Sequence, residues 1–386
     1  MSAEPLTEAG LKKKIWPLFS RVRKSRKIYL ANHSLGRPPD RMAQDVQHAL
    51  DIWYHDLDGA WSEWLAARER FRALTARLVG AKRSDCIIPK TSAGQGLRAV
   101  LNALEGDQHG EQRRGKLRVV ASDEEFDSLD FILRVYRDKG RLDLRLMPWR
   151  EMSVGNADLV VISSVMFRTS ECVTSLNKLL RAAKEAGALV LLDVYHHAGV
   201  LPLDLAGMEV DFAVGGSYKY LRGGPGACWL YVRPGLVETL RTLDTGWFAK
   251  KDMFRYERPD PPQFGAGGDA WLESTPPVLA PVQALAGLEL TLELGAVRLR
   301  DYSIEQKQLL ADFLTLRKIE SAGAGDEHGA FLTVTHAKAE KLVHELALRG
   351  IVADSRGDKL RLCPDILNTE AEMAQVAEEL AAVLAG

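Results

Sequence analysis

The sequence predicts an α/β protein with a mostly parallel sheet whose two faces are covered. Apolar strand-like runs alternate along the chain with amphipathic helical runs, which is typical of sheets built from strand–helix–strand units. The strand-like runs are nearly continuous in Val, Ile and Leu, as expected for strands buried on both faces. With 386 residues, the chain is long enough for two or three domains and a large core.

Six runs in the first two thirds of the chain fit strands. They are residues 85–90, 116–122, 158–167, 188–194, 210–217 and 227–232. Helices are predicted over 93–104 and over 175–187, where Gly187 ends the second one. Ligands of such sheets bind beyond the C-terminal ends of the strands, so residues just after these runs are candidates for a site.

The pattern changes after about residue 245, where a small α+β unit is predicted to follow. A Pro- and Gly-rich stretch over 258–271 is predicted as a loop, and long loops inside compact domains are often functional. The predicted elements of this part are a long helix over 276–295, a strand over 330–336, a helix over 337–349, strands within 351–364 and a helix over 369–385.

Composition excludes several classes of function. The formal net charge is −1, so neither a nucleic acid nor an anionic membrane surface is an expected partner. No run of eighteen apolar residues and no secretory signal is found, so no membrane span is expected. The four cysteines are widely spaced without a CxxC pair, so we predict no metal site, reduced thiols and a cytoplasmic location.

The stretch "GGSYKYLRGGPGACWLYV" (215–232) places Lys219 between two apolar runs, with a tyrosine on each side. A lysine acts as a covalent catalyst only when its amine is neutral, and burial lowers a lysine pKa and allows a Schiff base to form with an aldehyde. Lys219 follows the predicted strand 210–217, at a strand end where ligands bind. The alternative is a lysine whose stem is buried and whose amine reaches solvent.

The stretch "LVLLDVYHHAG" (189–199) places Asp193 at the end of an apolar strand. A carboxylate is costly there unless it is paired, and a protonated pyridine nitrogen is one suitable partner. The alternative is that Asp193 caps the next helix. His196 and His197 follow directly, and we expect His197 to be the one that is merely packed.

The stretch "PKTSAGQGLRAV" (89–100) combines a strand end, a turn of small residues and a helix start. Backbone N–H groups and the helix dipole make such a turn suitable for a phosphate, with Thr91, Ser92, Ala93 and Gly94 as candidates. Many Ser- and Gly-rich turns of this kind bind nothing, and neither a Walker loop nor GxGxxG is present.

These three motifs occur in the order phosphate turn, acid, lysine, and in this order the chain resembles the fold-type I pyridoxal phosphate enzymes of the class V aminotransferase group, and within it the kynureninases. "SYKYLRGGPGACWLYV" is similar to the kynureninase lysine motif, and "DVYHHAGVLPLDL" to its Asp-x-x-His-x-x-Gly strand end. "YLANHSLGRPP" (29–39) is similar to the N-terminal Asn-Ser-Leu-Gly signature. The resemblance spans roughly residues 28 to 364.

The resemblance implies roles for the residues of the three motifs. Lys219 would hold pyridoxal phosphate as the internal aldimine, and Asp193 would pair with the pyridine nitrogen beside His196. Tyr218 would touch the phosphate and move protons during turnover, and Ser92 and Ala93 would form the phosphate turn.

Further segments match the family by motif or by spacing. "DEEFDSLD" (123–130) nominates Phe126 to cover the pyridine face, with ordinary core packing as the alternative. "TGWFA" and "ESTPP" nominate Trp247 and Thr275 to complete the phosphate site, often from the neighbouring subunit. For the substrate, "DKLRLCP" nominates Arg361 as the carboxylate-binding arginine, against the alternative of a surface arginine on an edge strand, and Ser34 and His55 match substrate-side positions.

Four departures from the family pattern leave cofactor binding intact and put the substrate in question. Leu129 stands where the family has an acid or amide, and the alternative is that Asp130 takes its place. Met166 replaces a polar residue that often faces the cofactor, Arg222 replaces an asparagine, and Lys250 stands where a histidine is common.

The resemblance implies a large α/β domain with a seven-stranded, mostly parallel sheet and a small α+β C-terminal domain. We expect an N-terminal segment (1–48) packing on the small domain, a large cofactor-binding domain (49–278) and the small domain (279–386), in a homodimer with shared active sites. The implied reaction is hydrolysis of the Cβ–Cγ bond of L-kynurenine or 3-hydroxykynurenine to alanine and an anthranilate.

Three alternatives to this reaction remain. A class V aminotransferase or lyase acting on another amino acid would share every residue above. A cysteine desulfurase is disfavoured because no cysteine lies between Cys228 and Cys363. A non-catalytic regulator is disfavoured by the intact lysine and aspartate.

Overall fold

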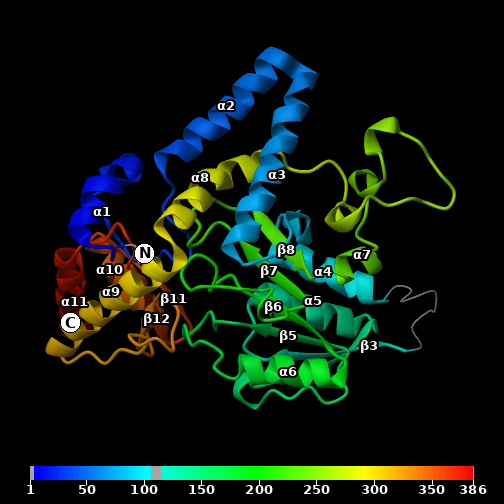
Figure 1. The fold of residues 1–386 in the computed structure, drawn as a ribbon. Coiled ribbons are helices and arrows are strands. Elements are labelled where there is room, and N and C mark those ends of the chain that lie inside the picture. Colours follow the sequence, from blue (N-terminus) through cyan, green and yellow to red (C-terminus); the bar gives the residue numbers. More distant parts are fainter. Residues whose placement is uncertain (1–3, 106–114, 386) are drawn as a thin grey trace.

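A seven-stranded sheet forms the centre of the fold in the computed structural model, which describes residues 4–105 and 115–385 (Figure 1). The strand order is β2-β8-β7-β6-β5-β3-β4, and β8 runs antiparallel to both of its neighbours, β2 and β7, while the other pairs are parallel. The strands are β2 (Ile87–Lys90), β3 (Leu117–Ser122), β4 (Leu142–Met147), β5 (Leu159–Ser163), β6 (Leu189–Asp193), β7 (Phe212–Gly216) and β8 (Cys228–Val232). The six strands predicted from apolar runs and the mostly parallel arrangement are confirmed.

The strand that sequence analysis missed is β4, at one edge of the sheet. Among the residues that the structure describes it pairs with β3 alone, and its leucines alternate with Asp143 and Arg145. An edge strand needs no continuous apolar run, because one side of it faces solvent.

Helices cover both faces of the sheet. The crossovers through α5 (Asp127–Asp138) and α6 (Leu176–Ala186) run in opposite directions along the strand order, and right-handed connections therefore put these helices on opposite faces. Helix α4 (Ala93–Glu105) packs against α5. A Cβ on Gly96 would lie 2.7 Å from Cγ1 of Val214, so only glycine lets α4 approach the sheet this closely. The reversal of direction falls between β5 and β3, where α/β sheets bind ligands.

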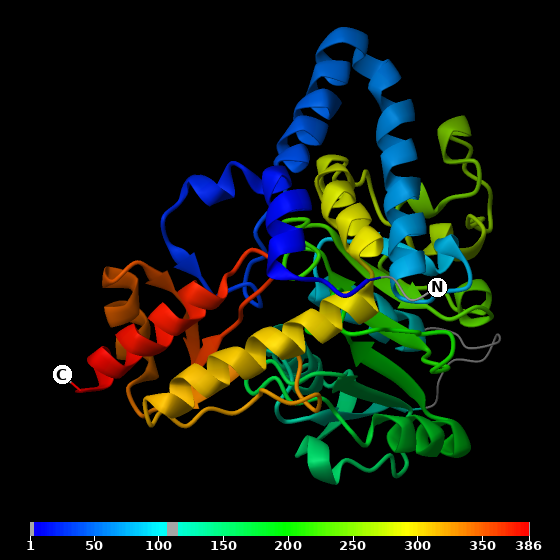
Figure 2. The ribbon, with the colours of Figure 1, turned by 60° about the vertical axis from the view of Figure 1, so that its left-hand side comes forward.

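A helical hairpin of α2 (Asp40–Asp56) and α3 (Ala60–Leu78) projects from the body of the protein (Figures 1 and 2). Both helices pack on α8 (Leu279–Leu294), which confirms the predicted long helix and begins after the Pro276–Pro277 pair. The loop predicted over 258–271 is mostly irregular and ends in a short 3₁₀ helix, Gly267–Trp271. A four-residue helix, α7 (Leu236–Thr239), follows β8.

A second, smaller layer of strands and helices is built from the C-terminal part of the chain, and α9 continues from α8 toward it in Figure 2. Leu310, Leu346, Leu362 and Leu380 are among the residues of its core. The antiparallel strands have the order β11-β12-β9. The elements are α9 (Ala296–Leu316), β9 (Leu332–Thr335), α10 (Ala339–Leu348), β10 (Ile351–Val352), β11 (Asp354–Arg356), β12 (Lys359–Leu362) and α11 (Glu370–Ala385).

The N-terminal segment runs along this smaller layer. It contains α1 (Glu8–Lys14) and β1 (Ile28–Tyr29), and β1 pairs in parallel with β10. The division of the chain at residues 48 and 278 remains a proposal, since α8 lies beyond the second boundary and packs on α2 and α3. Within residues 4–105 and 115–385, no helix is long and apolar enough to cross a membrane.

Candidate active site

A cavity of about 640 Å³, its mouth included, opens at the C-terminal ends of β5 and β6 and at the start of α4. The sequence-predicted residues that line it come from four separate parts of the chain. They are Ser92, Ala93, Phe126, Asp193, His196, Tyr218 and Lys219. The parallel register explains the convergence, because Ser163, the last residue of β5, lies directly opposite Asp193, the last residue of β6.

Lys219 has a buried side chain, only 5% exposed, rather than a solvent-reaching one. Its Nζ lies 2.6 Å from Nε2 of His196 and between 5.4 and 5.7 Å from the ring centres of Phe126, Tyr195 and Tyr218. Burial lowers the pKa of the Lys219 amine, and the negative charge of Asp193 opposes this shift. The site therefore favours a neutral, nucleophilic amine.

His196 is buried, and Nδ1 of its ring lies 3.2 Å from the hydroxyl of Tyr220. Burial, and then the positive charge of Lys219, hold the pKa of His196 well below its ordinary value. The neutral ring donates from Nδ1 and accepts a hydrogen bond from Lys219 at Nε2. His197 lies outside the cavity and contacts Ser164 and the carbonyl of Pro202, in line with a packed histidine.

Asp193 is buried and lines the cavity, and its Oδ1 accepts a hydrogen bond of 2.8 Å from the backbone N–H of Tyr195. Burial raises the pKa of this carboxyl, and the charge of Lys219 lowers it. No helix begins after Asp193 in this part of the structure, so helix capping does not explain the residue. Its lining position leaves it available to a cationic partner.

The turn before α4 has the geometry expected of an anion site. The hydroxyl of Ser92 accepts a hydrogen bond of 3.1 Å from the N–H of Gln95 and so caps the helix. Ala93 and Gly94 are the first two helical residues, whose N–H groups have no acceptor within the helix. Because Ser92 and Ala93 line the cavity, this helix end faces into it.

Trp247 and Thr275 do not line this cavity. Nε1 of Trp247 donates to Oγ1 of Thr275 at 3.1 Å, and Thr275 lines an adjoining cavity of about 970 Å³. The two cavities share Thr91, Gly226 and Cys228 as a common wall. Within one subunit, the structure therefore separates these two residues from Lys219.

Arg361 is buried and already paired. Its Nε and Nη2 contact the carboxylate of Asp354 at 2.8 and 2.5 Å, and its Nη1 donates to the carbonyl of Phe167 at 2.5 Å. Nε2 of His33 lies 2.7 Å from the same carboxylate. Although burial opposes it, hydrogen bonds from His33 and Arg361 hold the pKa of Asp354 well below its ordinary value. The surface-arginine alternative is wrong, and Asp354 fixes the orientation of the guanidinium.

Ser34 and His55 lie away from the cavity lining. Ser34 is in the turn after β1, where its N–H donates to the carbonyl of Ala31. His55 is exposed near the tip of the α2–α3 hairpin, and its Nδ1 bonds the carbonyl of Asp51.

The departures from the family pattern have structural explanations. Leu129 and Met166 are buried in the main core, and neither lines the cavity. Asp130 does not take the place of Leu129, because it pairs with Arg134 one turn along α5. Lys250 bonds the carbonyl of Glu257 within its own loop.

Sequence analysis missed Glu125, which lies directly behind the cavity. It is buried, and its two carboxyl oxygens contact the N–H and the hydroxyl of Ser163 at 2.8 and 2.6 Å. Burial raises the pKa of Glu125 to about 8, and the charge of Asp193 adds to this shift. In the sequence Glu125 belongs to an acidic run, which is typical of a solvated surface, so nothing distinguished it from its neighbours.

The profile of the family described as Aminotransferase class-V matches residues 55–368. The chain belongs to this family, and it is therefore an enzyme that depends on pyridoxal phosphate. Within the family it is similar to kynureninases. It is 30% identical over 361 residues to the kynureninase of Deinococcus radiodurans, covering 88% of this chain and 84% of that protein. The kynureninase of Salinispora tropica is 29% identical over 396 residues, covering 92% of this chain and 90% of that protein.

Solved structures support the fold. A mutant of C-DES with glycine covalently linked to its PLP cofactor superposes with a TM-score of 0.83 at 16% identity, covering 95% of this chain and 98% of that chain. A likeness at this identity confirms the fold-type I architecture.

The cavity is chemically suited to pyridoxal phosphate. A buried amine at Lys219 matches the aldehyde, and the buried carboxyl of Asp193 matches a protonated pyridine nitrogen. The open end of α4 matches the phosphate, and the ring of Phe126 lines the same cavity, 5.5 Å from Nζ of Lys219.

Proposed function

We propose that this enzyme hydrolyses the Cβ–Cγ bond of L-kynurenine or 3-hydroxykynurenine, giving alanine and an anthranilate. The observation that carries the proposal is similarity to kynureninases along most of the chain, in a protein whose cavity combines Lys219, Asp193 and His196. The substrate class is an α-amino acid with a free carboxylate and an aromatic ketone side chain.

When bound, pyridoxal phosphate supplies an electron sink for negative charge that develops on the substrate carbons. Asp193 keeps a proton on the ring nitrogen, because a buried carboxylate with a single backbone donor favours a cationic neighbour. Lys219 holds the cofactor at rest and then, as a free neutral amine, takes up the α-proton of the substrate.

His196 and Tyr218 support proton movement around Lys219. The neutral ring of His196 accepts a hydrogen bond from Nζ of Lys219 and keeps the amine directed into the cavity. Tyr218 lines the same cavity, and burial raises its pKa to about 12, so it stays protonated and able to donate. Ser92 and Ala93 hold the phosphate at the start of α4, and Phe126 covers the ring.

Arg361 binds the substrate carboxylate. Asp354 and the carbonyl of Phe167 occupy three of its N–H groups, and a guanidinium has more donors than these three bonds use. Because Asp354 holds the guanidinium rigidly, its remaining N–H groups are already oriented to bind the carboxylate of a substrate.

A homodimer completes the site. Trp247, Thr275 and His55 lie outside the cavity of their own subunit, which supports a contribution to the neighbouring one. Exposed aromatic and apolar side chains also mark the projecting hairpin and the nearby loop, namely Trp53, Tyr54, Leu57, Phe254 and Tyr256. Ser34 remains a proposed substrate-side residue.

The experiment is a turnover assay with kynurenine and 3-hydroxykynurenine, in which anthranilate fluorescence and alanine are measured together. Equal amounts of both products are expected. The second candidate function is that of a class V aminotransferase or lyase, and the description of the matching family as Aminotransferase class-V supports it. A keto acid formed from another amino acid, with no anthranilate from either kynurenine, replaces the proposal with that second function.

A further inference from the structure

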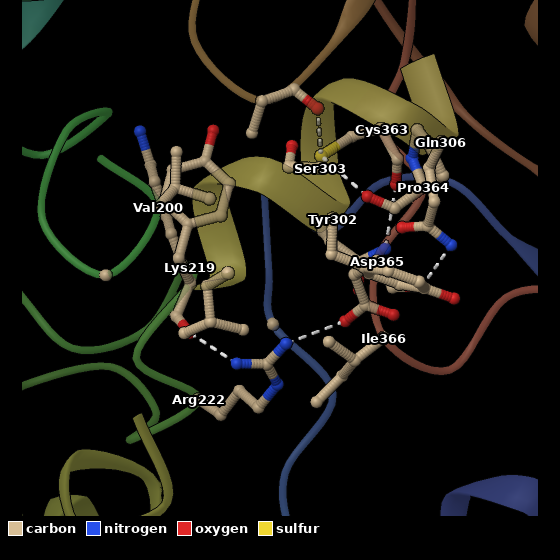
Figure 3. Close-up of a pocket in the computed structure, with 16 residues that line it drawn as sticks. Val200, Lys219, Arg222, Tyr302, Ser303, Gln306, Cys363, Pro364, Asp365 and Ile366 are labelled. Carbon is tan, nitrogen blue, oxygen red and sulfur yellow. Dashed lines mark hydrogen bonds and ion pairs between the residues drawn. The ribbon is translucent and has the colours of Figure 1, made fainter. Parts of the chain in front are cut away.

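Arg222 follows the lysine turn and is buried, with 5% of its surface exposed. Its Nη1 donates to the carbonyl of Tyr220 at 2.7 Å, and its Nη2 contacts Oδ2 of Asp365 at 3.0 Å (Figure 3). Its backbone N–H donates to the carbonyl of Lys219. One side chain thus connects the turn that holds the catalytic lysine with the segment that follows β12.

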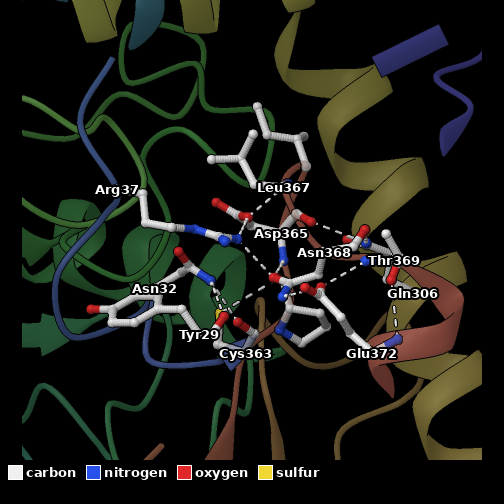
Figure 4. A network of polar contacts seen from close by, with 12 residues as sticks. Tyr29, Asn32, Arg37, Gln306, Cys363, Asp365, Leu367, Asn368, Thr369 and Glu372 are labelled. Atoms are coloured by element: carbon white, nitrogen blue, oxygen red, sulfur yellow. Dashed lines mark hydrogen bonds and ion pairs between the residues drawn. The ribbon is translucent and has the colours of Figure 1, made fainter. Parts of the chain in front are cut away.

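Asp365 is held by several groups at once (Figure 4). Its carboxylate accepts bonds from Arg222, from Arg37 and from the N–H of Leu367, and Gln306 of α9 donates to its carbonyl at 3.0 Å. Although burial opposes it, the charges of Arg37 and Arg222 hold the pKa of Asp365 below its ordinary value. The carboxyl group of Asp365 is therefore ionised, and its hydrogen bonds hold it in one position.

The N-terminal segment also contacts the turn that holds Lys219. The N–H of Gly36 donates to the carbonyl of Tyr218 at 2.7 Å, and a Cβ at Gly36 would lie 1.9 Å from the carbonyl oxygen of Lys219. Gly36, Arg222 and Asp365 line a common cavity, and Lys219 belongs to its wall (Figure 3). Three chain segments thus meet behind the lysine.

The backbone of Arg222 has φ of +56°, a left-handed conformation that asparagine adopts more easily than arginine. An arginine there costs conformational energy that its contacts must offset. The two contacts that asparagine is too short to make are those to Tyr220 and Asp365.

We propose that Arg222 is a positioning residue. Through Asp365 it fixes the position of Arg361 relative to Lys219, so that a substrate carboxylate bound to Arg361 places the rest of the substrate at the lysine amine. Asp365 lies four residues after Arg361 and three residues beyond the end of β12, the strand that carries Arg361. Fixing Asp365 to the lysine turn therefore fixes the substrate-binding arginine relative to the reacting amine. The inference rests on the proposed role of Arg361, but not on which amino acid is the substrate.

The test compares Arg222→Asn with wild type and with Arg168→Asn. Asparagine suits the left-handed backbone and keeps the lysine turn, while it removes the link to Asp365. Arg168 pairs with Asp358 at 2.7 Å between the same two layers, but both side chains are exposed, so its loss is expected to matter little. Two dissociation constants are measured from cofactor absorbance: pyridoxal phosphate binding to the apoenzyme, and L-alanine binding to the holoenzyme.

The expected result for Arg222→Asn is an L-alanine dissociation constant raised about tenfold, as for the loss of a charged hydrogen bond, with cofactor affinity unchanged. With a turned-over substrate, KM rises and kcat stays close to wild type. Arg168→Asn matches wild type in every measurement. L-alanine binding is measured without kynurenine turnover. The test of Arg222 can therefore succeed or fail independently of the turnover assay that tests the proposed function.

An L-alanine dissociation constant that is the same in Arg222→Asn and Arg168→Asn overturns the proposal. Arg222→Lys is the second variant, because it keeps the charge and reaches only one of the two acceptors, and an intermediate effect is expected. If Arg222→Lys loses cofactor and L-alanine binding together, Arg222 merely supports the lysine turn and the positioning role is wrong.

Discussion

Nζ of Lys219 lies 2.6 Å from Nε2 of His196, and both side chains are buried. The charge of Lys219 lowers the pKa of His196, and burial lowers the pKa of both groups. Two cations are strongly disfavoured at this separation inside the protein. The pair therefore favours a neutral histidine that accepts from lysine and a lysine that loses its proton readily.

The first prediction concerns the pH at which the apoenzyme takes up its cofactor covalently. Burial lowers the pKa of Lys219, and the charge of Asp193 partly restores it. Attachment should therefore begin well below the ordinary lysine pKa, and Asp193→Asn should move its midpoint to still lower pH because a charge that favours the ammonium is gone. The rate of the absorbance change at saturating cofactor gives the midpoint. A shift to higher pH in Asp193→Asn would contradict the electrostatic account.

The second prediction concerns Glu125 and stability. Its pKa is raised from 4.5 to about 8 in the folded protein, so the folded state binds more protons than the unfolded state between these values. Stability contributed by this group is fully present below the lower value and is lost as pH rises toward the upper one. The free energy of unfolding of wild type should fall over this range relative to Glu125→Gln, which keeps a neutral acceptor for Ser163.

Denaturant titrations at several pH values measure this difference. Glu151→Gln, at an exposed glutamate, is the control and should follow wild type. Parallel curves for wild type and Glu125→Gln would mean that Glu125 is ionised in the folded protein.

The third prediction separates Arg361 from its neighbour Arg356. Arg361→Ala should raise KM by the loss of a charge-assisted contact of about 2–4 kcal/mol. Arg356 lies 3.6 Å from the same Asp354 but is exposed, so Arg356→Ala should change KM little. Steady-state kinetics of both variants give the comparison. Equal effects would assign the role to the local positive charge rather than to Arg361.

The fourth prediction concerns the dimer. If Thr275 completes the phosphate site of a neighbouring subunit, the protein should be a dimer by light scattering. Thr275→Val should weaken cofactor binding without affecting the α4 turn. Dilution of the protein tests whether cofactor binding depends on the dimer. If the sites are shared, the cofactor is released as the dimer dissociates. A monomer that retains its cofactor tightly is incompatible with shared sites.

Sequence patterns pointed to several buried residues that line one cavity, because burial leaves a signal in the sequence. Asp193 and Lys219 interrupt or follow apolar strands, and the turn at Ser92 and Ala93 joins a strand to a helix. Strand β4 was missed because an edge strand tolerates alternating charge.

Contacts between distant segments left no such signal. Asp354 pairs with Arg361 and His33, and Asp365 pairs with Arg37 and Arg222, yet neither acid stands out from its local stretch of sequence. His33, Arg37 and Arg222 reach these carboxylates only in the folded protein, because they lie 143 to 328 residues away in the sequence. A residue whose role depends on a partner hundreds of positions away cannot be recognised from local pattern alone.

We propose that Lys219 is the residue that holds the cofactor. Borohydride reduction of the holoenzyme followed by peptide mapping tests it directly, since reduction fixes the cofactor to the nitrogen that carries it. The structure offers two other buried lysines among its described residues, Lys90, which pairs with Glu273, and Lys307, which bonds the carbonyls of Gly323 and Gly325. We expect the label on the peptide that contains Lys219 and on no other. A label on Lys90 or Lys307, with Lys219 unmodified, would contradict it.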